Sequence, residues 1–157
     1  MVYDALLRWK AAAKRKVLLV DGARQIGKTF LIEEFARNEY ASYIKIDFLN
    51  DARAVELLGK AQDARQVVEM VSLISGKPLG DRKTLLFFDE VQKAQNIVTI
   101  SKYLLEDGRF DVVMSGSMLG VELTEVKSFP VVYDHPPYVP ADVRGILLGA
   151  KRSSNGA

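Results

Sequence analysis

A glycine-rich segment that ends in lysine and threonine is the strongest chemical signal in the sequence. Residues 22–29 read Gly-Ala-Arg-Gln-Ile-Gly-Lys-Thr and match the pattern G-x-x-x-x-G-K-[ST] at every fixed position. In such a loop the glycines let successive backbone N–H groups point at phosphate oxygens, and the following helix adds a partial positive charge. The candidate phosphate-binding residues are Gly22, Ala23, Arg24, Gln25, Ile26, Gly27, Lys28 and Thr29.

The last two residues of this loop have side chains with separate chemical roles. The Lys28 ammonium is expected to reach the β- and γ-phosphates of a nucleotide as a point charge. The Thr29 hydroxyl is expected to bind Mg²⁺, a hard cation that keeps several waters and takes few protein ligands. The loop therefore predicts a site for a nucleotide together with its magnesium ion.

An acidic pair follows a second apolar run. Residues 84–88 read Thr-Leu-Leu-Phe-Phe and lead directly into Asp89 and Glu90. Taken alone, this pattern is typical of a simple strand end. With the glycine-rich loop upstream, we interpret Asp89 as a Walker-B carboxylate that assists Mg²⁺. Glu90 is then placed to activate an attacking water, which favours hydrolysis over transfer to a second substrate.

A third polar segment follows another apolar run. Residues 111–114 are predicted to form a strand that leads into Ser115, Gly116 and Ser117. Either serine is a candidate to contact the γ-phosphate or the attacking water. A Gly-Ser turn capped by hydroxyl groups explains the same residues equally well.

The elements that must position these residues alternate along the chain. Short apolar runs predict strands, and apolar residues at helical spacing predict helices. Strands are expected at residues 17–20, 43–48, 84–88 and 110–114, and helices at 3–13, 29–38, 51–60, 62–75 and 94–107. Strands that alternate with helices are typical of a parallel α/β sheet.

Length and composition fit one globular domain. The chain has 157 residues, of which 48% are hydrophobic, and a formal charge of +2, which does not favour a nucleic-acid partner. It contains no cysteine, so disulfides and thiolate metal sites are excluded. Its apolar runs are much shorter than the roughly 20 residues of a membrane span. We therefore expect a cytoplasmic protein without a membrane segment.

Taken together, these motifs resemble those of one protein family. The loop, Asp89-Glu90-Val91-Gln92, and residues 103–110 leading to Ser115 look like the AAA-type P-loop ATPases of bacteria and archaea. Members of that family carry a C-terminal nuclease-like domain of unknown function. The resemblance covers about residues 1–130.

The resemblance implies a fold, ligands and residue roles. The fold would be a three-layer α/β P-loop NTPase sandwich with a parallel sheet of strand order 5-1-4-3-2. The ligands would be ATP and Mg²⁺. Lys28 and Thr29 would bind phosphate and metal, Asp89 would assist the metal, Glu90 would be the catalytic base, and Ser115 would take the sensor position.

The end of the chain departs from this family pattern. Four of the five prolines fall within residues 130–140, and Pro130 argues against a regular fifth strand at residues 126–133. The sequence thus predicts an ATPase core at residues 1–130 and a poorly ordered, Pro-rich tail at 131–157. The lone His135 in this tail is interpreted as incidental.

A shift of the coding frame would explain that departure. Read one nucleotide later, the codon sets of residues 134–150 permit I-T-L-R-T-Y-P-L-T-F-E-E-F-F-W-A-L, which looks like the family's next segment. We therefore hypothesise a truncation or frame shift near residue 131. The DNA that encodes these residues would decide the question.

Three functions remain open at this point. The leading one is Mg²⁺-dependent ATP hydrolysis by an AAA-type core fragment. The alternatives are a P-loop kinase for a small molecule, although no Arg-rich lid is visible, and a truncated remnant that binds nucleotide weakly without turnover. A homo-oligomer or a missing C-terminal domain is a possible partner, but nothing nominates Arg24, Arg109 or Arg144 as an arginine finger.

Overall fold

The structure is a computed structural model that describes most of the N-terminal two thirds of the chain. The described residues are 2–12, 17–21, 27–79, 84–94, 96–97, 101, 104, 109–116 and 131–133. The helices are α1 (Val2–Ala11), α2 (Lys28–Glu39), α3 (Ala52–Gly59), α4 (Ala64–Ser75) and the short 3-10 helix η1 (Val91–Lys93). The strands are β1 (Leu18–Asp21), β2 (Ser42–Asp47), β3 (Thr84–Asp89), β4 (Asp111–Gly116) and β5 (Val131–Tyr133).

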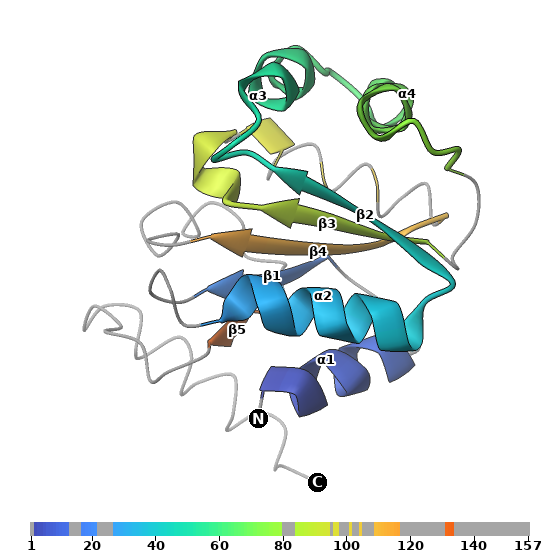
Figure 1. Cartoon of the computed structure of the whole chain (residues 1–157), viewed down its shortest axis with the longest axis vertical. Helices are drawn as coiled ribbons and strands as arrows, with labels where there is room; N and C mark the ends of the chain where they lie inside the picture. The colour runs from blue at the N-terminus through green and yellow to red at the C-terminus, as the bar shows by residue number, and fades with distance from the viewer. Residues whose placement is uncertain are drawn as a thin grey trace, which may run out of the picture.

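The five strands form one parallel sheet with the order β2-β3-β4-β1-β5. This is the predicted order 5-1-4-3-2 counted from the other edge, so the expected fold is confirmed. β1, which leads into the glycine-rich loop, lies between β4 and β5 (Figure 1). The loop therefore begins inside the sheet, where the strand before it is held on both edges.

The fifth strand corrects the expectation that Pro130 would interrupt pairing. Val131, Val132 and Tyr133 pair in parallel with Leu19, Val20 and Asp21. Pro130 precedes the first paired residue, so its missing N–H is not needed in this ladder. The first three residues of the predicted tail thus belong to the sheet. Residues 134–157, with His135 and Arg144, lie outside the described residues, so the tail and the frame shift stay predictions.

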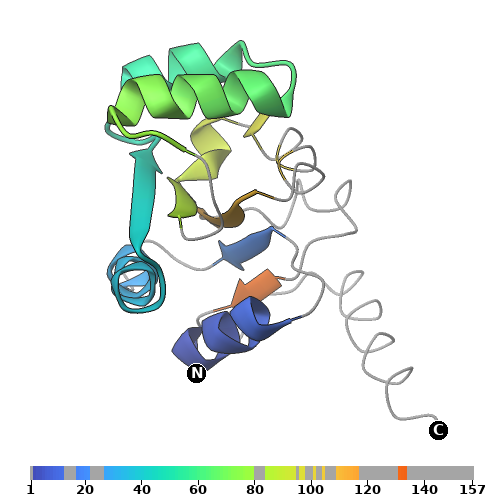
Figure 2. The ribbon, with the colours of Figure 1, turned by 90° about the vertical axis from the view of Figure 1, so that its right-hand side faces the viewer.

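Two apolar cores cover the two faces of the sheet. Side chains of a strand alternate between its faces, and in β3 both faces are buried. Leu86 and Phe88 belong to the core under α3 and α4. Leu85 and Phe87 belong to the core under α1 and α2. Figures 1 and 2 show these two helix pairs on opposite sides of the sheet, which gives the expected three layers.

Capping interactions set several helix ends, and apolar spacing alone does not predict them. α3 and α4 begin where the Asp51 and Asp63 side chains accept hydrogen bonds from the Ala54 and Gln66 backbone N–H groups. α4 ends at Gly76, whose φ of 67° suits a left-handed C-cap. Of the helix expected at 94–107, residues 96, 97, 101 and 104 are helical, Ala94 is not, and the others lie outside the described residues.

Candidate functional site

The carboxyl ends of the central strands bring three predicted site residues together. The Thr29 hydroxyl, in the first turn of α2, donates a hydrogen bond of 2.8 Å to Asp89 Oδ2 at the end of β3. The Ser115 hydroxyl, near the end of β4, donates to the other oxygen, Asp89 Oδ1. Both carboxylate oxygens of Asp89 are therefore fixed by hydroxyl groups from neighbouring elements.

Lys28 reaches the end of the same sheet from the first position of α2. Its Nζ donates a hydrogen bond of 2.8 Å to the backbone carbonyl of Gly116, the last residue of β4. The side chain is buried, with 7% exposure. A lysine is seldom so buried without a partner, and the ammonium has three donors, so it can hold this carbonyl and still bind another group.

Strand alternation explains why these side chains lie on one face. Asp89 follows Leu85 and Phe87 by even steps, and Ser115 follows Val113, all on the face covered by α2. Asp89 is 4% exposed and Ser115 is fully buried. Because buried polar groups need hydrogen-bond partners, the two side chains stabilise each other at the carboxyl ends of β3 and β4.

Gly27 is the N-cap residue of α2. It has a φ of 80° and caps the helix without a side-chain hydrogen bond. A residue with a Cβ is disfavoured in this left-handed conformation, so the sequence needs glycine here. A helix that begins in this way presents backbone N–H groups and a partial positive charge to an anion. Gly22, Ala23, Arg24, Gln25 and Ile26 lie outside the described residues, so their phosphate contacts stay predictions.

Glu90 has an unusual backbone conformation directly after Asp89. Its φ is 58°, and within the described ranges it is the one residue other than glycine with a positive φ. Its carboxylate accepts a hydrogen bond from the Gln92 side-chain amide. Left-handed backbone in a residue with a Cβ is strained and concentrates at functional sites. The Glu90 backbone therefore turns sharply directly after the buried Asp89, and its carboxylate pairs with Gln92.

Sequence reasoning missed one charged neighbour of Asp89, Lys45, and a second carboxylate, Glu33, that lies close to the same lysine. Lys45 Nζ, from β2, lies 3.8 Å from Asp89 Oδ2 and 3.8 Å from Glu33 Oε2, on α2. The available signal was the alternation of residues 43–47, which puts Lys45 on the face of Tyr43 and Asp47. A lysine in an edge strand usually faces solvent, so that signal alone does not indicate a site.

The donor set fits a magnesium ion. Thr29 and Asp89 offer hard oxygen ligands, and the Thr29 hydroxyl keeps its lone pairs while it donates to Asp89. In the described part of the chain, no group of three or more His, Cys, Asp or Glu side chains could hold a metal by itself. This arrangement suits an ion that takes few protein ligands and completes its shell with water and phosphate.

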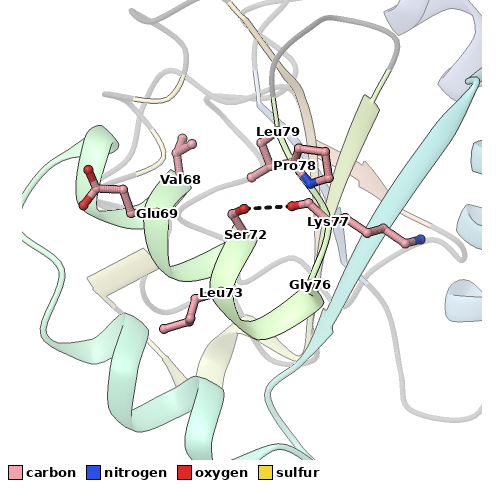
Figure 3. A pocket seen from close by; sticks show the side chains of 8 residues that line it. All are labelled: Val68, Glu69, Ser72, Leu73, Gly76, Lys77, Pro78 and Leu79. Carbon is pink, nitrogen blue, oxygen red and sulfur yellow. Dashed lines mark hydrogen bonds between the residues drawn. The ribbon is translucent and has the colours of Figure 1, made fainter.

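A groove at the other end of the sheet has different chemistry. It lies between the second half of α4 and the segment that leads toward β3, and Ser72 Oγ donates 2.8 Å to the Lys77 carbonyl beside it (Figure 3). Its lining includes Leu73, Pro78 and Leu79. These residues precede β3, whereas Asp89 ends it, so the groove is separate from the candidate site.

Among the described residues, no helix combines the length and the apolar character that crossing a membrane requires.

The fold and site define an α/β protein of the P-loop NTPase type, with a parallel sheet and a lysine and threonine at the first helix after β1. The family model described as "AAA domain" matches residues 14–133, and the chain belongs to that family. It is therefore an AAA-type ATPase core. The general function of this class is nucleotide binding with ATPase-type activity. The nuclease-like domain of the resemblance stays a prediction.

A solved structure supports the same fold. PCH-2 of C. elegans is similar with a TM-score of 0.51 and 14% sequence identity. The similarity covers 97% of this chain and 46% of PCH-2, so this chain spans less than half of that one. At this identity the likeness shows the fold alone. The comparison with curated proteins gives no match.

Proposed function

We propose that this chain binds ATP with Mg²⁺ and hydrolyses it. The observation that carries the proposal is the hydrogen bond of 2.8 Å between the Thr29 hydroxyl and the Asp89 carboxylate. It joins the end of the glycine-rich loop to the end of β3, which a phosphate-and-magnesium site requires. The AAA family membership supports the same function in general.

Lys28 would bind the β- and γ-phosphates. Its buried ammonium is held at the end of β4 by the Gly116 carbonyl, which keeps it close to the start of α2. A positive charge and the N-terminus of a 12-residue helix both favour a phosphate at this place. Loss of the ammonium would remove most of the affinity for a triphosphate.

Thr29 and Asp89 would hold the magnesium ion. When bound, the ion would neutralise developing charge on the phosphates. Ser115 supports this arrangement, because its hydroxyl donates to Asp89 and fixes the carboxylate. We propose that Ser115 acts as a positioning residue through Asp89, while its contact with the γ-phosphate stays a prediction.

Glu90 would take a proton from the attacking water. The water oxygen forms a bond to the γ-phosphorus as the bond to the bridging oxygen breaks, and ADP leaves. The Gln92 amide, which donates to the Glu90 carboxylate, would orient it toward the water.

Cytoplasmic location and assembly into a homo-oligomer stay predictions.

Calorimetric titration with ATP and phosphate-release assays test the proposal. We expect Lys28→Ala to abolish ATP binding, and Glu90→Gln to keep binding and stop phosphate release. Lys60→Ala is the matched control, because Lys60 is exposed and pairs with Glu56 on α3, away from the site. Unchanged ATP affinity in Lys28→Ala would contradict the proposal. Phosphate release without an added acceptor separates hydrolysis from a kinase reaction.

A further inference from the structure

A lysine on β2 shares the carboxylate that is proposed to hold the metal. Lys45 Nζ lies 3.8 Å from Asp89 Oδ2, the same oxygen that accepts the Thr29 hydroxyl at 2.8 Å. The ammonium is also 3.8 Å from Glu33 Oε2. One cation of the protein therefore lies between the proposed metal-holding carboxylate and a second carboxylate on α2.

The surroundings of Glu33 make it the alternative partner for this lysine. The Tyr43 hydroxyl, two residues before Lys45 on the same strand face, lies 3.4 Å from Glu33 Oε1 and donates to it. This contact leaves Glu33 Oε2 facing the ammonium. The carboxylate of Glu33 is thus held in place on the side of α2 that faces β2.

Asp47 does not take this role, although it pairs in register with Asp89. Its Oδ1 accepts a hydrogen bond of 2.9 Å from the Leu49 N–H, and its Oδ2 accepts one of 2.7 Å from the Asn50 amide. The Asp47 side chain therefore stabilises the turn that follows β2. Glu33 and Asp89 are the carboxylates within ion-pair distance of Lys45 in the described part of the chain.

The two distances show that electrostatic attraction, and not a hydrogen bond, holds the Lys45 ammonium near these carboxylates. At 3.8 Å the ammonium lies beyond hydrogen-bond distance from both oxygens, and the Lys45 and Glu33 side chains are each 25% exposed. A flexible lysine in this position can move toward either carboxylate. A dication at Asp89 would repel the ammonium and favour its movement toward Glu33.

We propose that Lys45 is the counter-cation of Asp89. Its ammonium neutralises the Asp89 carboxylate in the metal-free protein and moves toward Glu33 when Mg²⁺ binds with nucleotide. Lys45 thereby sets the magnesium concentration that nucleotide binding requires. It is a positioning residue, not a catalytic one, because it acts through Asp89. This inference rests on the proposed function, since it assumes that Asp89 assists a nucleotide-bound metal.

Calorimetric titration of the full chain with the non-hydrolysable analogue AMP-PNP, repeated over a series of MgCl₂ concentrations and in EDTA, tests the inference. We expect Lys45→Met to lower the half-saturating Mg²⁺ concentration about three- to tenfold, the range for removing a partly exposed charge. Methionine keeps most of the aliphatic stem, and Lys45→Gln serves as a second variant if Lys45→Met does not fold. Lys45→Arg should restore the wild-type value.

Two further variants separate this role from general charge effects. Glu33→Gln should raise the half-saturating Mg²⁺ concentration, and this effect should largely disappear in the Lys45→Met background. Lys60→Met removes the same charge from the exposed Lys60–Glu56 pair on α3 and should change nothing. A Lys60→Met effect as large as that of Lys45→Met would overturn the inference.

The remaining outcomes distinguish the two proposals. If Lys45→Met leaves the Mg²⁺ dependence unchanged, or weakens AMP-PNP binding equally in EDTA and in MgCl₂, the inference is wrong while the proposed function stands. The second result would make Lys45 a direct phosphate ligand. If the wild-type chain fails to bind AMP-PNP at any MgCl₂ concentration, the proposed function is overturned and the inference with it.

Discussion

At the scale of single residues, the site depends on side chains whose partners come from distant parts of the chain. Asp89 accepts hydrogen bonds from Thr29 and Ser115, which lie on different elements. The loop pattern and the acidic pair were visible in the sequence because their spacing is local. The contact between Ser115 and Asp89 was not, because it depends on the register that places Phe88 opposite Met114.

Lys45 shows the same limit of sequence reasoning. Its position in an alternating strand predicts only which face it shares with Tyr43 and Asp47. Whether that face meets solvent or Asp89 depends on which strand lies next to β2, and this is a property of the whole sheet.

The strained conformation of Glu90 gives a prediction about stability. Glu90→Gly and Glu90→Ala both remove the carboxylate, but only alanine keeps a Cβ at a φ of 58°. We expect the glycine variant to be more stable by roughly 1 kcal/mol, the reverse of the usual order. Chemical unfolding measures the difference. An alanine variant of equal or greater stability would show that the turn relaxes on substitution.

A buried pair outside the site gives a second prediction. The Tyr40 hydroxyl, after α2, donates 2.7 Å to Asp111 Oδ2 at the start of β4, and the Asp111 side chain is buried. Tyr40→Phe should lower the free energy of unfolding by about 1–3 kcal/mol, because a buried acceptor loses a donor. Tyr43→Phe, which loses a longer contact of 3.4 Å to the partly exposed Glu33, is the matched control and should change it less.

At the scale of elements, α2 and α4 each have a glycine with positive φ at one end. Gly27 precedes α2 with a φ of 80°, and Gly76 follows α4 with a φ of 67°. A Cβ at either position would meet no described atom within 4 Å, so the backbone conformation alone opposes substitution. The two glycines therefore form a matched pair for mutation.

We expect Gly27→Ala and Gly76→Ala to destabilise the protein by similar amounts, about 1–2 kcal/mol each. Only Gly27→Ala should also weaken ATP binding, because it disturbs the start of α2 next to Lys28 and Thr29. Unfolding curves and calorimetric titrations of both variants check this. Equal loss of ATP affinity in the two variants would mean that binding follows stability and not the local loop geometry.

The predicted elements agree with the structure where the pattern was strong and local. The buried run before Asp89 is β3, and the periodic segments 51–60 and 62–75 are α3 and α4 with shifted ends. The order implied by the family resemblance places a fifth strand beside the first, but proline and unusual composition argued against residues 126–133 as that strand. The pairing of residues 131–133 with β1 shows that they supply it.

At the scale of the whole molecule, nucleotide binding should stabilise the fold, because the site joins α2, β3 and β4. At a ligand concentration of about 100 times Kd, mass action contributes about 2.7 kcal/mol. For a domain of this size, this corresponds to an increase in Tm of roughly 5–10 °C. Thermal unfolding with and without Mg-ATP measures the shift. No shift at saturating nucleotide would favour a remnant without binding.

The position of β1 has a consequence for how the protein is made. β1 ends at residue 21, yet its two neighbours in the sheet begin at residues 111 and 131. During synthesis on the ribosome, the strand that leads into the phosphate loop leaves the exit tunnel long before either neighbour exists. β2 and β3 can pair earlier, since both have emerged once residue 89 is free. The nucleotide site therefore forms only after β4 and β5 have emerged, long after the loop itself is translated.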